Sequence, residues 1–412
     1  MSKYSKSLEY LSRAEKLIPV QSQTFSKSPQ YFVKGVSPVY LEKGNGAHVI
    51  DVDGNEYLDY ILGLGVITLG YNYPIVNEAI ENQLRDGIIF SLPHPLEIEL
   101  SELLTEIIPC AEMVRFSKTG SEVTSAAIKA ARAYTGRDHI AFRGYHGWHD
   151  WYSIVTEKNK GIPESYSEYM HEFKYNDLSS LEWIFNRYPD DIATVIMEPM
   201  IVEEPRNDFL NGVKDLAHRN GALLIFDEIV TGFRWSLGGA QEYFSVIPDL
   251  ATFGKGISNG MPLSAIVGKK EIMQEFEEVF FSTTFGGECL SLAAGLATIE
   301  EMMKGNMISH IWKLGKRLKD GLNSIGLRCI GFPCRPMIEL SYDSPILRSL
   351  YLQELIKKGI LIHSGMLINL CYSHTKGDID KTLNAFAEIK QDIDRGKIRL
   401  EGEMVKPAFR RL

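Results

Sequence analysis

The sequence predicts an α/β protein with two parts: a large, mostly parallel sheet covered by helices, and a smaller α+β domain. From about Glu97 onward, short runs that are apolar throughout alternate with segments whose apolar residues recur at helical spacing. Strands that are apolar throughout are buried on both faces, and their alternation with helices is typical of a parallel sheet. After about residue 300 the pattern changes to long helical segments with short strands between them. We therefore expect a second domain in the C-terminal third of the chain.

The chain is expected to divide into an N-terminal segment at residues 1–60, a large domain at 61–300 and a small domain at 301–412. Within Lys43–Leu62, the residues Asp51 to Asn55 (Asp-Val-Asp-Gly-Asn) form a turn signal between two alternating runs. This pattern predicts a small antiparallel hairpin. We expect the N-terminal segment to pack with the small domain.

The elements of the two domains follow from the same patterns. Ser121–Tyr134 is alanine-rich and helical in pattern, and Phe209–Arg219 is typical of an amphipathic helix that Gly221 ends. The expected strands of the large domain are Met113–Phe116, His139–Arg143, Ile192–Met197, Ala222–Phe226, Leu250–Phe253 and Leu263–Val267. The small domain is expected to contain helices at Ile308–Leu322, Pro345–Lys358 and Asp378–Asp394, and strands at Met337–Leu340 and Ile360–His363.

Composition and charge narrow the class of protein. Of the 412 residues, 44% are hydrophobic and 24% are charged, close to the averages of folded soluble proteins. The 53 acidic and 44 basic residues give a net charge of −9, which argues against a nucleic-acid or membrane partner. Residues 1–20 hold no continuous apolar stretch like that of a secretory signal. Five scattered cysteines suit a reducing compartment, so we expect a cytoplasmic protein. They are Cys110, Cys289, Cys329, Cys334 and Cys371.

Three of the expected strands each end in an ionisable residue. Glu198 follows Ile192–Met197, Asp227 follows Ala222–Phe226, and Lys255 follows Leu250–Phe253. In open α/β sheets, ligands bind beyond the carboxyl ends of the strands. Any one of these charges is explained simply by a solvated loop. Ionisable residues at the ends of three strands, with the lysine between two glycines, favour a binding site.

These residue types point to pyridoxal phosphate (PLP) chemistry. A lysine in such a pocket can lose its proton and form a Schiff base with an aldehyde. An aspartate on a neighbouring strand suits the protonated pyridine nitrogen of PLP. The phosphate needs backbone N–H groups, and the expected helix that begins at Thr119-Gly120-Ser121-Glu122 offers its N-terminus.

The same residues bear on two other kinds of site. Asp227-Glu228 after an apolar run also resembles a strand of nucleotide hydrolases, but the chain has no phosphate-binding loop that ends in Gly-Lys-Ser or Gly-Lys-Thr. His146 and His149 lie three apart with Asp150 adjacent, but no metal-binding motif accompanies them, so no metal is expected.

The sequence resembles the class III PLP-dependent aminotransferases from about Val39 to Ile393. Its closest similarity is to the glutamate-1-semialdehyde 2,1-aminomutase branch, through Arg132–Arg137 and the Thr-Gly-Phe-Arg ending at Arg234. The blocks that carry the resemblance are Thr119–Glu122, Tyr145–Gly147, Glu198–Pro199, Asp227–Arg234 and Pro248–Lys255.

The resemblance implies fold type I, with a large PLP-binding domain, a small domain, and a homodimer with shared active sites. It implies that Lys255 holds the cofactor as an internal aldimine and that Asp227 pairs with the pyridine nitrogen. Tyr145 and Ile229 would lie on the two faces of the ring, and Thr284 would reach the phosphate of the neighbouring subunit. The other cofactor contacts implied are Thr119, Gly120, Ser121, His146 and Glu198.

The sequence departs from the aminomutase pattern at the substrate site. Lys27 stands where that branch has an arginine, and a lysine lacks the two-pronged hydrogen bonding of a guanidinium. The stretch Trp148–Tyr175 is shorter than in the mutase and lacks its Gly/Ser-rich lid. Glu203 matches ordinary class III aminotransferases, yet Gly365–Asn369 lacks the arginine that binds glutamate in many of them. Lys27, Trp148 and Glu203 are the candidate substrate residues, although Trp148 is equally consistent with a core position.

We therefore predict a PLP-dependent aminotransferase that moves an amino group from a small-molecule amine donor to an aldehyde or keto acceptor, with pyridoxamine 5′-phosphate as the intermediate form of the cofactor. Lys255 would move the proton as general base and acid. A glutamate-1-semialdehyde 2,1-aminomutase, which serves tetrapyrrole precursor synthesis, is the alternative. A non-catalytic binding protein on the same fold is a third hypothesis, and racemase or decarboxylase chemistry stays open.

Overall fold

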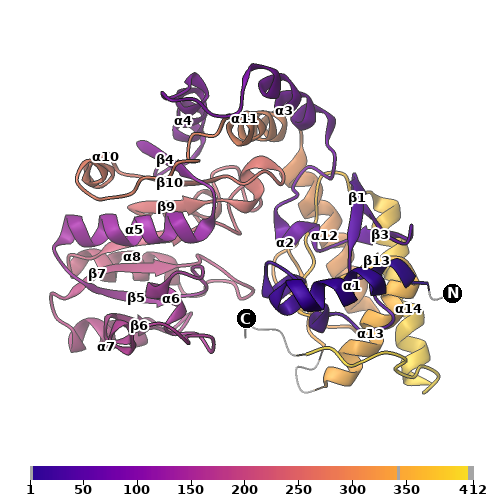
Figure 1. Cartoon of the computed structure of the whole chain (residues 1–412). Helices are drawn as coiled ribbons and strands as arrows, with labels where there is room; N and C mark the ends of the chain where they lie inside the picture. The colour runs from indigo at the N-terminus through magenta and orange to yellow at the C-terminus, as the bar shows by residue number, and fades with distance from the viewer. Residues whose placement is uncertain (1–2, 341–343, 407–412) are drawn as a thin grey trace. The chain divides into compact units, whose positions relative to one another are not determined.

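The computed structural model describes residues 3–340 and 344–406 (Figure 1). The chain divides into two compact units. The first unit combines residues 1–73 with 306–412, and the second contains residues 74–305. The residues expected to bind PLP all belong to the second unit.

A seven-stranded sheet forms the centre of the second unit, in the order β4-β10-β9-β8-β7-β5-β6. The strands from β9 to β6 pair in parallel, whereas β10 is antiparallel to both of its neighbours. This arrangement confirms the predicted mostly parallel sheet. The strands are β4 (Met113–Ser117), β5 (His139–Arg143), β6 (Met170–Glu172), β7 (Ile192–Met197), β8 (Leu223–Asp227), β9 (Leu250–Phe253) and β10 (Ser264–Gly268).

The sheet differs in detail from the expectation. β6 was not predicted, because this edge strand is only three residues long and carries polar side chains. The strand predicted to stop at Phe226 continues through Asp227, which pairs with Thr252 of β9. Asp227 is therefore held by the sheet itself rather than by a loop.

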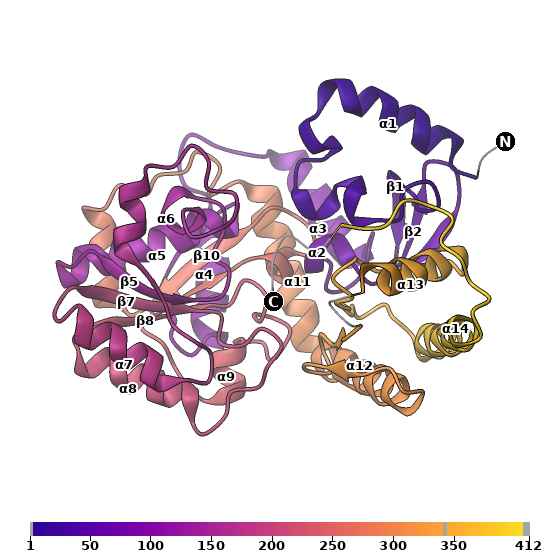
Figure 2. The same cartoon turned by 90° about the horizontal axis from the view of Figure 1, so that it is seen from below.

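Helices cover both faces of this sheet, so every residue of β7, β8, β9 and β10 is buried. Helix α5 lies on one face, and α7 and α8 lie on the other (Figure 2). The helices of the unit are α3 (Pro74–Asp86), α4 (Pro95–Ile107), α5 (Gly120–Thr135), α6 (Asp150–Ser153), α7 (Leu178–Arg187), α8 (Phe209–Arg219), α9 (Ala240–Phe244), α10 (Lys270–Met273) and α11 (Cys289–Lys304), with short 3₁₀ turns η4 (Glu164–Tyr169), η5 (Lys255–Ser258) and η6 (Gln274–Glu277).

The face of β8 that packs against α5 shows the direction in which Asp227 points. Leu223 and Ile225 of β8 pack in one cluster with Val123 and Ala127 of α5. Alternate residues of a strand face the same side, so Asp227 also projects towards α5. The sheet thus aims this carboxylate at the side on which the N-terminal turn of α5 lies.

The first unit contains a four-stranded sheet in the order β1-β2-β3-β13. β2 (His48–Asp51) and β3 (Glu56–Asp59) form the predicted antiparallel hairpin, which β1 (Leu41–Asn45) extends. β13 (Ile360–Leu361) pairs in parallel with β3, so the N-terminal hairpin and the C-terminal segment share one sheet. The strand predicted at Met337–Leu340 is limited to β12 (Met337–Ile338), which pairs with β11 (Cys329–Ile330).

The helices of the first unit include the three predicted near the C-terminus. They are α1 (Ser5–Leu17), α2 (Leu62–Gly65), α12 (Met307–Ser324), α13 (Pro345–Lys357) and α14 (Lys376–Asp394), with 3₁₀ turns η1 (Pro19–Gln21), η2 (Phe25–Lys27) and η3 (Pro29–Tyr31). Within the described residues, none of the helices of either unit has the length and apolarity that crossing a membrane requires.

A buried glutamate fixes the segment that follows Asp227. The Glu228 carboxylate accepts hydrogen bonds from the backbone N–H groups of Ala240 (2.8 Å) and Gln241 (2.8 Å), and from the Thr231 hydroxyl. A side chain at Gly239 would place its Cβ 2.6 Å from Glu228 Oε2, so the chain can approach this carboxylate only at a glycine. Burial raises the pKa of Glu228 to about 7, although these hydrogen bonds oppose the shift.

Replacing Glu228 by Gln should change how stability depends on pH. Because the pKa is about 7 in the folded chain and near 4.5 when unfolded, the folded state keeps a proton that the unfolded state has lost between these values. The free energy of unfolding therefore loses this contribution as pH rises through that window. Glu228→Gln has no such proton, so its stability relative to the wild type should rise from about pH 4.5 to pH 7 and then level off. Urea unfolding at a series of pH values measures the difference.

A second variant gives the control for this prediction. Thr231→Val keeps the shape of the side chain but removes a donor that lowers the pKa of Glu228. Its pH-dependent loss of stability should therefore extend to higher pH than that of the wild type. A stability difference between Glu228→Gln and wild type that stays constant with pH would contradict the assignment.

Candidate active site

The candidate site lies at the carboxyl ends of three neighbouring strands. β9, β8 and β7 are adjacent in the sheet. Asp227 is the last residue of β8, Glu198 follows β7 directly, and Lys255 follows β9 after Gly254. The structure therefore brings the three ionisable strand-end residues to one edge of the sheet.

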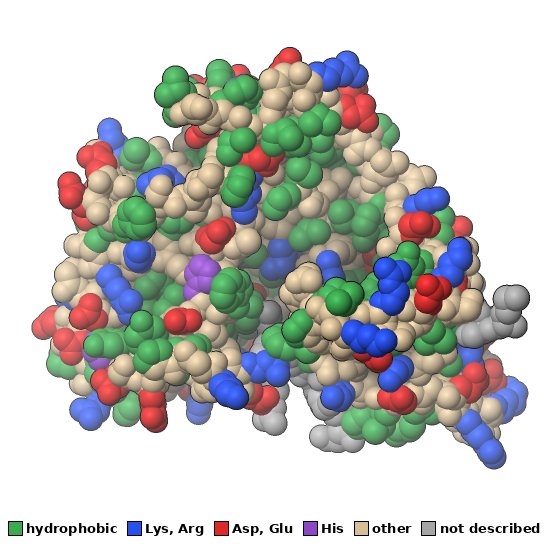
Figure 3. All heavy atoms as spheres, viewed as in Figure 1, with side chains coloured by type: hydrophobic (Ala, Val, Ile, Leu, Met, Phe, Trp, Pro, Cys, Tyr) green, Lys and Arg blue, Asp and Glu red, His purple; other side chains and the backbone are tan. Residues whose placement is uncertain are grey.

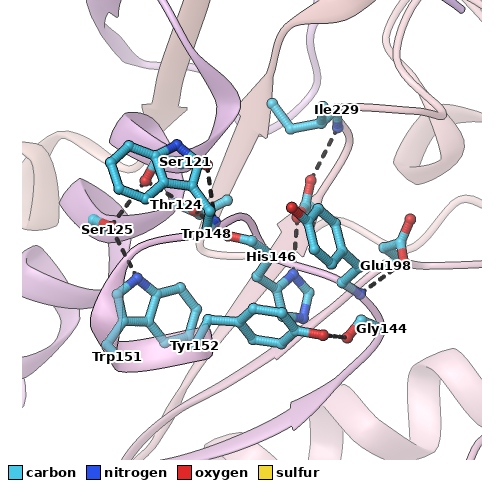
Figure 4. Close-up of polar contacts among 12 residues, drawn as sticks. Ser121, Thr124, Ser125, Gly144, His146, Trp148, Trp151, Tyr152, Glu198 and Ile229 are labelled. Atoms are coloured by element: carbon cyan, nitrogen blue, oxygen red, sulfur yellow. Dashed lines mark hydrogen bonds and ion pairs between the residues drawn. The ribbon is translucent and has the colours of Figure 1, made fainter. Parts of the chain in front are cut away.

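Asp227 is a buried carboxylate whose two oxygens are both held. Its Oδ2 lies 2.8 Å from Nδ1 of His146, and its Oδ1 accepts a hydrogen bond from the backbone N–H of Ile229 at 3.1 Å (Figure 4). Asp227 is 3% exposed and His146 is 1% exposed. Because an ionised carboxylate only accepts hydrogen bonds, Nδ1 of His146 carries the proton. Each carboxylate oxygen keeps a second lone pair for a further donor.

Aromatic rings and a backbone hydrogen bond fix the His146 imidazole. The ring of Trp151 is nearly parallel to it, with centroids 6.2 Å apart, and Tyr152 meets it edge-on at 5.4 Å. The Thr124 hydroxyl donates to the His146 carbonyl at 2.8 Å. Within residues 3–340 and 344–406, Nε2 of this buried ring has no hydrogen-bond partner. The imidazole therefore binds Asp227 through Nδ1.

Lys255 adopts an uncommon backbone conformation. It is half-buried at the start of η5, and its φ of +41° lies in the left-handed region that side chains other than glycine rarely enter. Strained conformations of this kind persist where the surrounding structure enforces them, and they concentrate at functional sites. Gly254 before it is buried, and a Cβ there would lie 3.0 Å from Cδ1 of Ile229.

The N-terminal turn of α5 lies against the same isoleucine. A Cβ at Gly120 would lie 3.1 Å from Cδ1 of Ile229, so Ile229 contacts both the start of α5 and the turn that carries Lys255. The backbone N–H groups of a helix N-terminus bind phosphate well. Thr119 is the exposed N-cap residue of this helix, and Ser121 is buried in its first turn.

Glu122 stabilises this turn. Its carboxylate accepts hydrogen bonds from the Ser117 hydroxyl (2.8 Å) and from the backbone N–H groups of Lys118 (3.1 Å) and Thr119 (2.7 Å). Burial acts to raise the pKa of Glu122, but these hydrogen bonds outweigh it and hold the pKa below its usual value. These hydrogen bonds organise the start of the helix.

Glu198 positions the loop that carries Tyr145. The carboxylate Oε2 of Glu198 accepts the backbone N–H of Tyr145 at 2.9 Å, and the Tyr145 ring packs edge-on against Tyr152 at 5.4 Å. The Tyr152 hydroxyl in turn donates to the Gly144 carbonyl at 2.8 Å. These contacts assign Glu198 a structural task in the loop that sequence analysis did not foresee.

The candidate substrate residues and Thr284 lie in exposed positions. Thr284 is exposed in the loop between η6 and α11, Trp148 is 69% exposed, and Glu203 is exposed and forms an ion pair with Arg206 at 2.9 Å. Trp148 is therefore not a core residue. Lys27 is an exposed residue of η2 in the first unit.

An ion pair connects the loop of Thr284 with the start of α5. Lys118 Nζ lies 2.9 Å from Glu288 Oε2, and both side chains are mostly buried. Lys118 directly precedes Thr119, and Glu288 is the N-cap residue of α11, whose carboxylate also accepts the backbone N–H groups of Leu290 and Ser291. Sequence analysis missed this pair because its members are 170 positions apart.

Sequence analysis also missed the pairing of His146 with Asp227. The two residues are 81 positions apart, so no local pattern links them. One signal was available. A carboxylate at the end of a fully apolar strand is buried and needs a hydrogen-bond donor, and the family motif Tyr145-His146-Gly147 contains one in its histidine. The hydroxyl of Ser125, which binds the Trp151 indole at 2.8 Å, gave no signal in the sequence.

The residues present fit PLP. Lys255 offers an amine, Asp227 offers a fixed carboxylate with lone pairs to spare, and the start of α5 offers backbone N–H groups. Ile229 lies against the start of α5 at Gly120 and against the lysine turn at Gly254, and both glycines leave room for its side chain. In the part of the chain that the structure describes, no group of three or more His, Cys, Asp or Glu side chains has the arrangement of a metal site.

Comparison with known proteins identifies the family. Residues 31–331 match the family model of class III aminotransferases. A 3-aminobutyryl-CoA aminotransferase from Cloacimonas acidaminovorans is 36% identical over 95% of this chain and 98% of its own length. A glutamate-1-semialdehyde 2,1-aminomutase from Brevibacillus brevis is 36% identical over 88% of this chain and 96% of its own length.

A solved structure has the same fold. The FumI protein of a Sphingopyxis species, in its PLP internal aldimine form, superimposes with a TM-score of 0.91 and 25% identity over 97% of this chain and 99% of its own. These findings confirm the predicted fold type I and the predicted cofactor. The chain belongs to the class III aminotransferases, which are PLP-dependent enzymes.

Proposed function

We propose that the protein transfers an amino group between two small molecules, from an amine donor to an aldehyde or keto acceptor, and that Lys255 and Asp227 are its catalytic residues. The observation that carries the proposal is the set of contacts around Ile229. One side chain lies against the start of α5 and the Lys255 turn, and its backbone N–H binds Asp227. An amine, an anion-binding helix start and a buried carboxylate therefore meet around one residue.

The roles of the residues follow from their chemistry. PLP, when bound, supplies an electron sink for the carbon that loses a proton. The Lys255 amine would take up this proton as general base and return it as general acid. The Asp227 carboxylate would hold a proton on the ring nitrogen, and Nδ1–H of His146 keeps the carboxylate oriented. Gly120 and Ser121 would donate hydrogen bonds to the phosphate at the start of α5, and Tyr145 and Ile229 would enclose the ring.

We favour transfer between two substrates over an intramolecular mutase reaction. The relatives do not decide the matter, because an aminotransferase and an aminomutase are both 36% identical to this chain. Two sequence features support our choice. Lys27 is a point charge that would hold a substrate carboxylate less directionally than an arginine. The stretch Trp148–Tyr175 has only one glycine, Gly161, and is occupied by α6, η4 and β6.

We propose that the second unit is the large PLP-binding domain and that the first unit combines the N-terminal segment with the small domain. We also propose a cytoplasmic location. All five cysteines are free and buried, which suits a reducing compartment.

We further propose that the enzyme is a homodimer. An apolar surface covers α3, α4 and the segment between them, and Figure 3 shows hydrophobic side chains gathered there. Contiguous exposed apolar residues mark interfaces between proteins. A second copy is the occupant that suits this surface, because the family resemblance implies that Thr284 completes the site of a neighbouring subunit. The residues of this apolar surface are Ile75, Leu84, Ile88, Ile89, Phe90, Leu92 and Ile98.

A spectroscopic titration tests the proposed reaction. The absorption of bound PLP should be lost on addition of at least one amine from a panel that includes glutamate and diaminovalerate, and a keto acid or aldehyde should restore it. Lys255→Ala should lower the rate by roughly 10² to 10⁴-fold, because it removes the general base. After borohydride reduction, peptide mass mapping should find the cofactor on Lys255 in the wild type.

Three outcomes would contradict parts of this proposal. Consumption of glutamate-1-semialdehyde without a second substrate would establish the mutase reaction instead. A cofactor that no amine changes would indicate a binding protein. A reduced cofactor attached to another lysine would exclude Lys255.

Substitutions at Asp227 and His146 distinguish the effect of the Asp227 charge from the effect of the hydrogen bond that His146 donates to it. Asp227→Asn keeps the shape but removes the negative charge, so the rate of amine-dependent loss of PLP absorption should fall by at least about 100-fold. His146→Phe keeps a flat ring beside Trp151 and Tyr152 but removes the donor to Asp227, so we expect a fall of roughly tenfold. Stopped-flow absorption at saturating amine measures both. A His146→Phe enzyme as fast as the wild type would show that Asp227 does not depend on the imidazole.

A charge on the apolar surface should separate the subunits. Leu92 is 79% exposed. Leu92→Asp should raise the dissociation constant of the dimer by at least about tenfold, because a charge buried in an interface loses its hydration. Analytical ultracentrifugation measures this constant. Ile247→Asp, at an exposed residue outside this surface, is the matched control and should not change it. If Leu92→Asp dissociates no more than the control, the subunits meet elsewhere or not at all.

A further inference from the structure

Trp148 combines a fixed backbone with a largely exposed side chain. It directly follows the Tyr145-His146-Gly147 motif, and its indole is 69% exposed. Figure 4 shows the indole next to Ser121, at the N-terminal turn of α5. The ring of an exposed tryptophan offers a large flat surface on which another flat group can stack.

Glycines and hydrogen bonds hold the backbone of this loop on both sides of Tyr145. A Cβ at Gly144 would lie 2.7 Å from Oε2 of Glu198, and a Cβ at Gly147 would lie 2.4 Å from the Ser121 hydroxyl. Both glycines have φ values above +100°. Because Gly147 has no side chain, the backbone N–H of Trp148 reaches the Ser121 hydroxyl at 3.2 Å. The loop is therefore packed directly against α5.

A single hydroxyl fixes the residues after Trp148. Ser125 Oγ donates to the Ser121 carbonyl at 2.8 Å, accepts the Trp151 indole N–H at 2.8 Å, and lies 2.7 Å from Nδ1 of His149. A hydroxyl has one hydrogen, which Ser121 already receives, so His149 Nδ1 is the donor. Burial lowers the pKa of His149, which favours the neutral imidazole. All acceptor and donor capacity of Ser125 is thus used to hold this loop.

The two tryptophans of the loop consequently differ. Trp151 is partly buried, and its indole N–H is bonded to Ser125. The Trp148 ring meets the His149 ring edge-on at 4.8 Å, which sets its direction and leaves most of its surface in solvent. A rigid aromatic surface of this kind can stack with another flat group at little entropic cost.

We propose that Trp148 is a specificity-determining residue that stacks against a flat, apolar part of the substrate, such as an aromatic ring. The inference rests on the proposed function, because the substrate is identified through its amine. The position of Trp148 supports a substrate as the occupant: its backbone binds Ser121, at the start of α5, and it is three residues from Tyr145. The preferred donor or acceptor is then larger than a short amino acid such as glutamate.

Paired amines test the proposal. 3-Phenylpropylamine and butylamine share a primary amine on an unbranched alkyl chain, and only the first carries a ring. Their apparent dissociation constants come from the amine dependence of the loss of PLP absorption in the holoenzyme. In Trp148→Ala, the constant for 3-phenylpropylamine should rise by about tenfold, and the constant for butylamine should change by less than about twofold. Trp148→Phe, which keeps a flat ring, should lie between Trp148→Ala and wild type.

A non-reactive ligand separates this inference from the proposed function. 3-Phenylpropan-1-ol has no amine, so calorimetric binding of this alcohol to the holoenzyme does not depend on turnover. Its affinity should fall by about tenfold in Trp148→Ala. If no amine reacts but the alcohol still binds through Trp148, the proposed function fails and this inference stands. If amines react but neither ring-bearing compound depends on Trp148, only this inference fails.

Trp183 provides the matched control. It is 63% exposed on α7 of the same unit, so Trp183→Ala removes a comparable indole from a helix on the opposite face of the sheet from α5 (Figure 2). This variant should bind both compounds like the wild type. A stronger effect of Trp148→Ala on 1,4-diaminobutane than on 3-phenylpropylamine would overturn the proposal in favour of cation binding. A larger dimer dissociation constant in Trp148→Ala, with amine binding unchanged, would overturn it in favour of a subunit contact.

Discussion

The burial of the Asp227 charge is the constraint on which the site depends. A carboxylate at the end of a fully buried strand is unstable unless donors surround it, because the protein interior solvates charge poorly. β8 places Asp227 on the α5 side of the sheet, and two donors meet it there: Nδ1 of His146 and the backbone N–H of Ile229. These donors come from the loops after β5 and β8. The sheet thus sets the position of the carboxylate, and the hydrogen bonds to the carboxylate set the positions of both loops.

Ile229 extends this constraint to the rest of the site. Its backbone is tied to Asp227, and its side chain lies where a Cβ at Gly120 or Gly254 would almost touch it. The start of α5, our candidate phosphate site, and the turn that carries Lys255 are therefore spaced by one hydrocarbon side chain, which neither titrates nor competes for hydrogen bonds. A side chain at either position would press on this methyl group, so glycine suits both positions. The left-handed conformation of Lys255 follows Gly254 directly and is held within the same packed region.

Sequence analysis predicted the parts of the fold that depend on local pattern. The strand ends at Glu198, Asp227 and Lys255 follow from apolar runs, and their proximity follows from the parallel order of the strands. The antiparallel direction of β10 was not predicted, although only residues 254–263 connect it to β9. A connection of that length is short for a crossover to a parallel neighbour, so it could have indicated the reversal. The pairs His146–Asp227 and Lys118–Glu288 span 81 and 170 positions and depend on the completed fold. Only the need of a buried Asp227 for a donor pointed to the first pair.

The difference between local sequence patterns and contacts made in the completed fold also explains why the motifs identify the cofactor but not the substrate. PLP is recognised by residues at fixed positions on rigid elements, and any chain with this reaction needs an amine, a carboxylate and an anion site in that arrangement. Substrate recognition needs only surfaces that lie near the reacting carbon, and an aminotransferase and an aminomutase are equally identical to this chain. In this chain, Ser125 and the glycines Gly144 and Gly147 hold the loop after Tyr145, and the Trp148 indole is exposed on that loop. Rigidity around an exposed apolar group favours one shape of ligand over others, because the group cannot fold back to bury itself. We therefore propose that the loop after Tyr145 contributes to the selectivity of the enzyme.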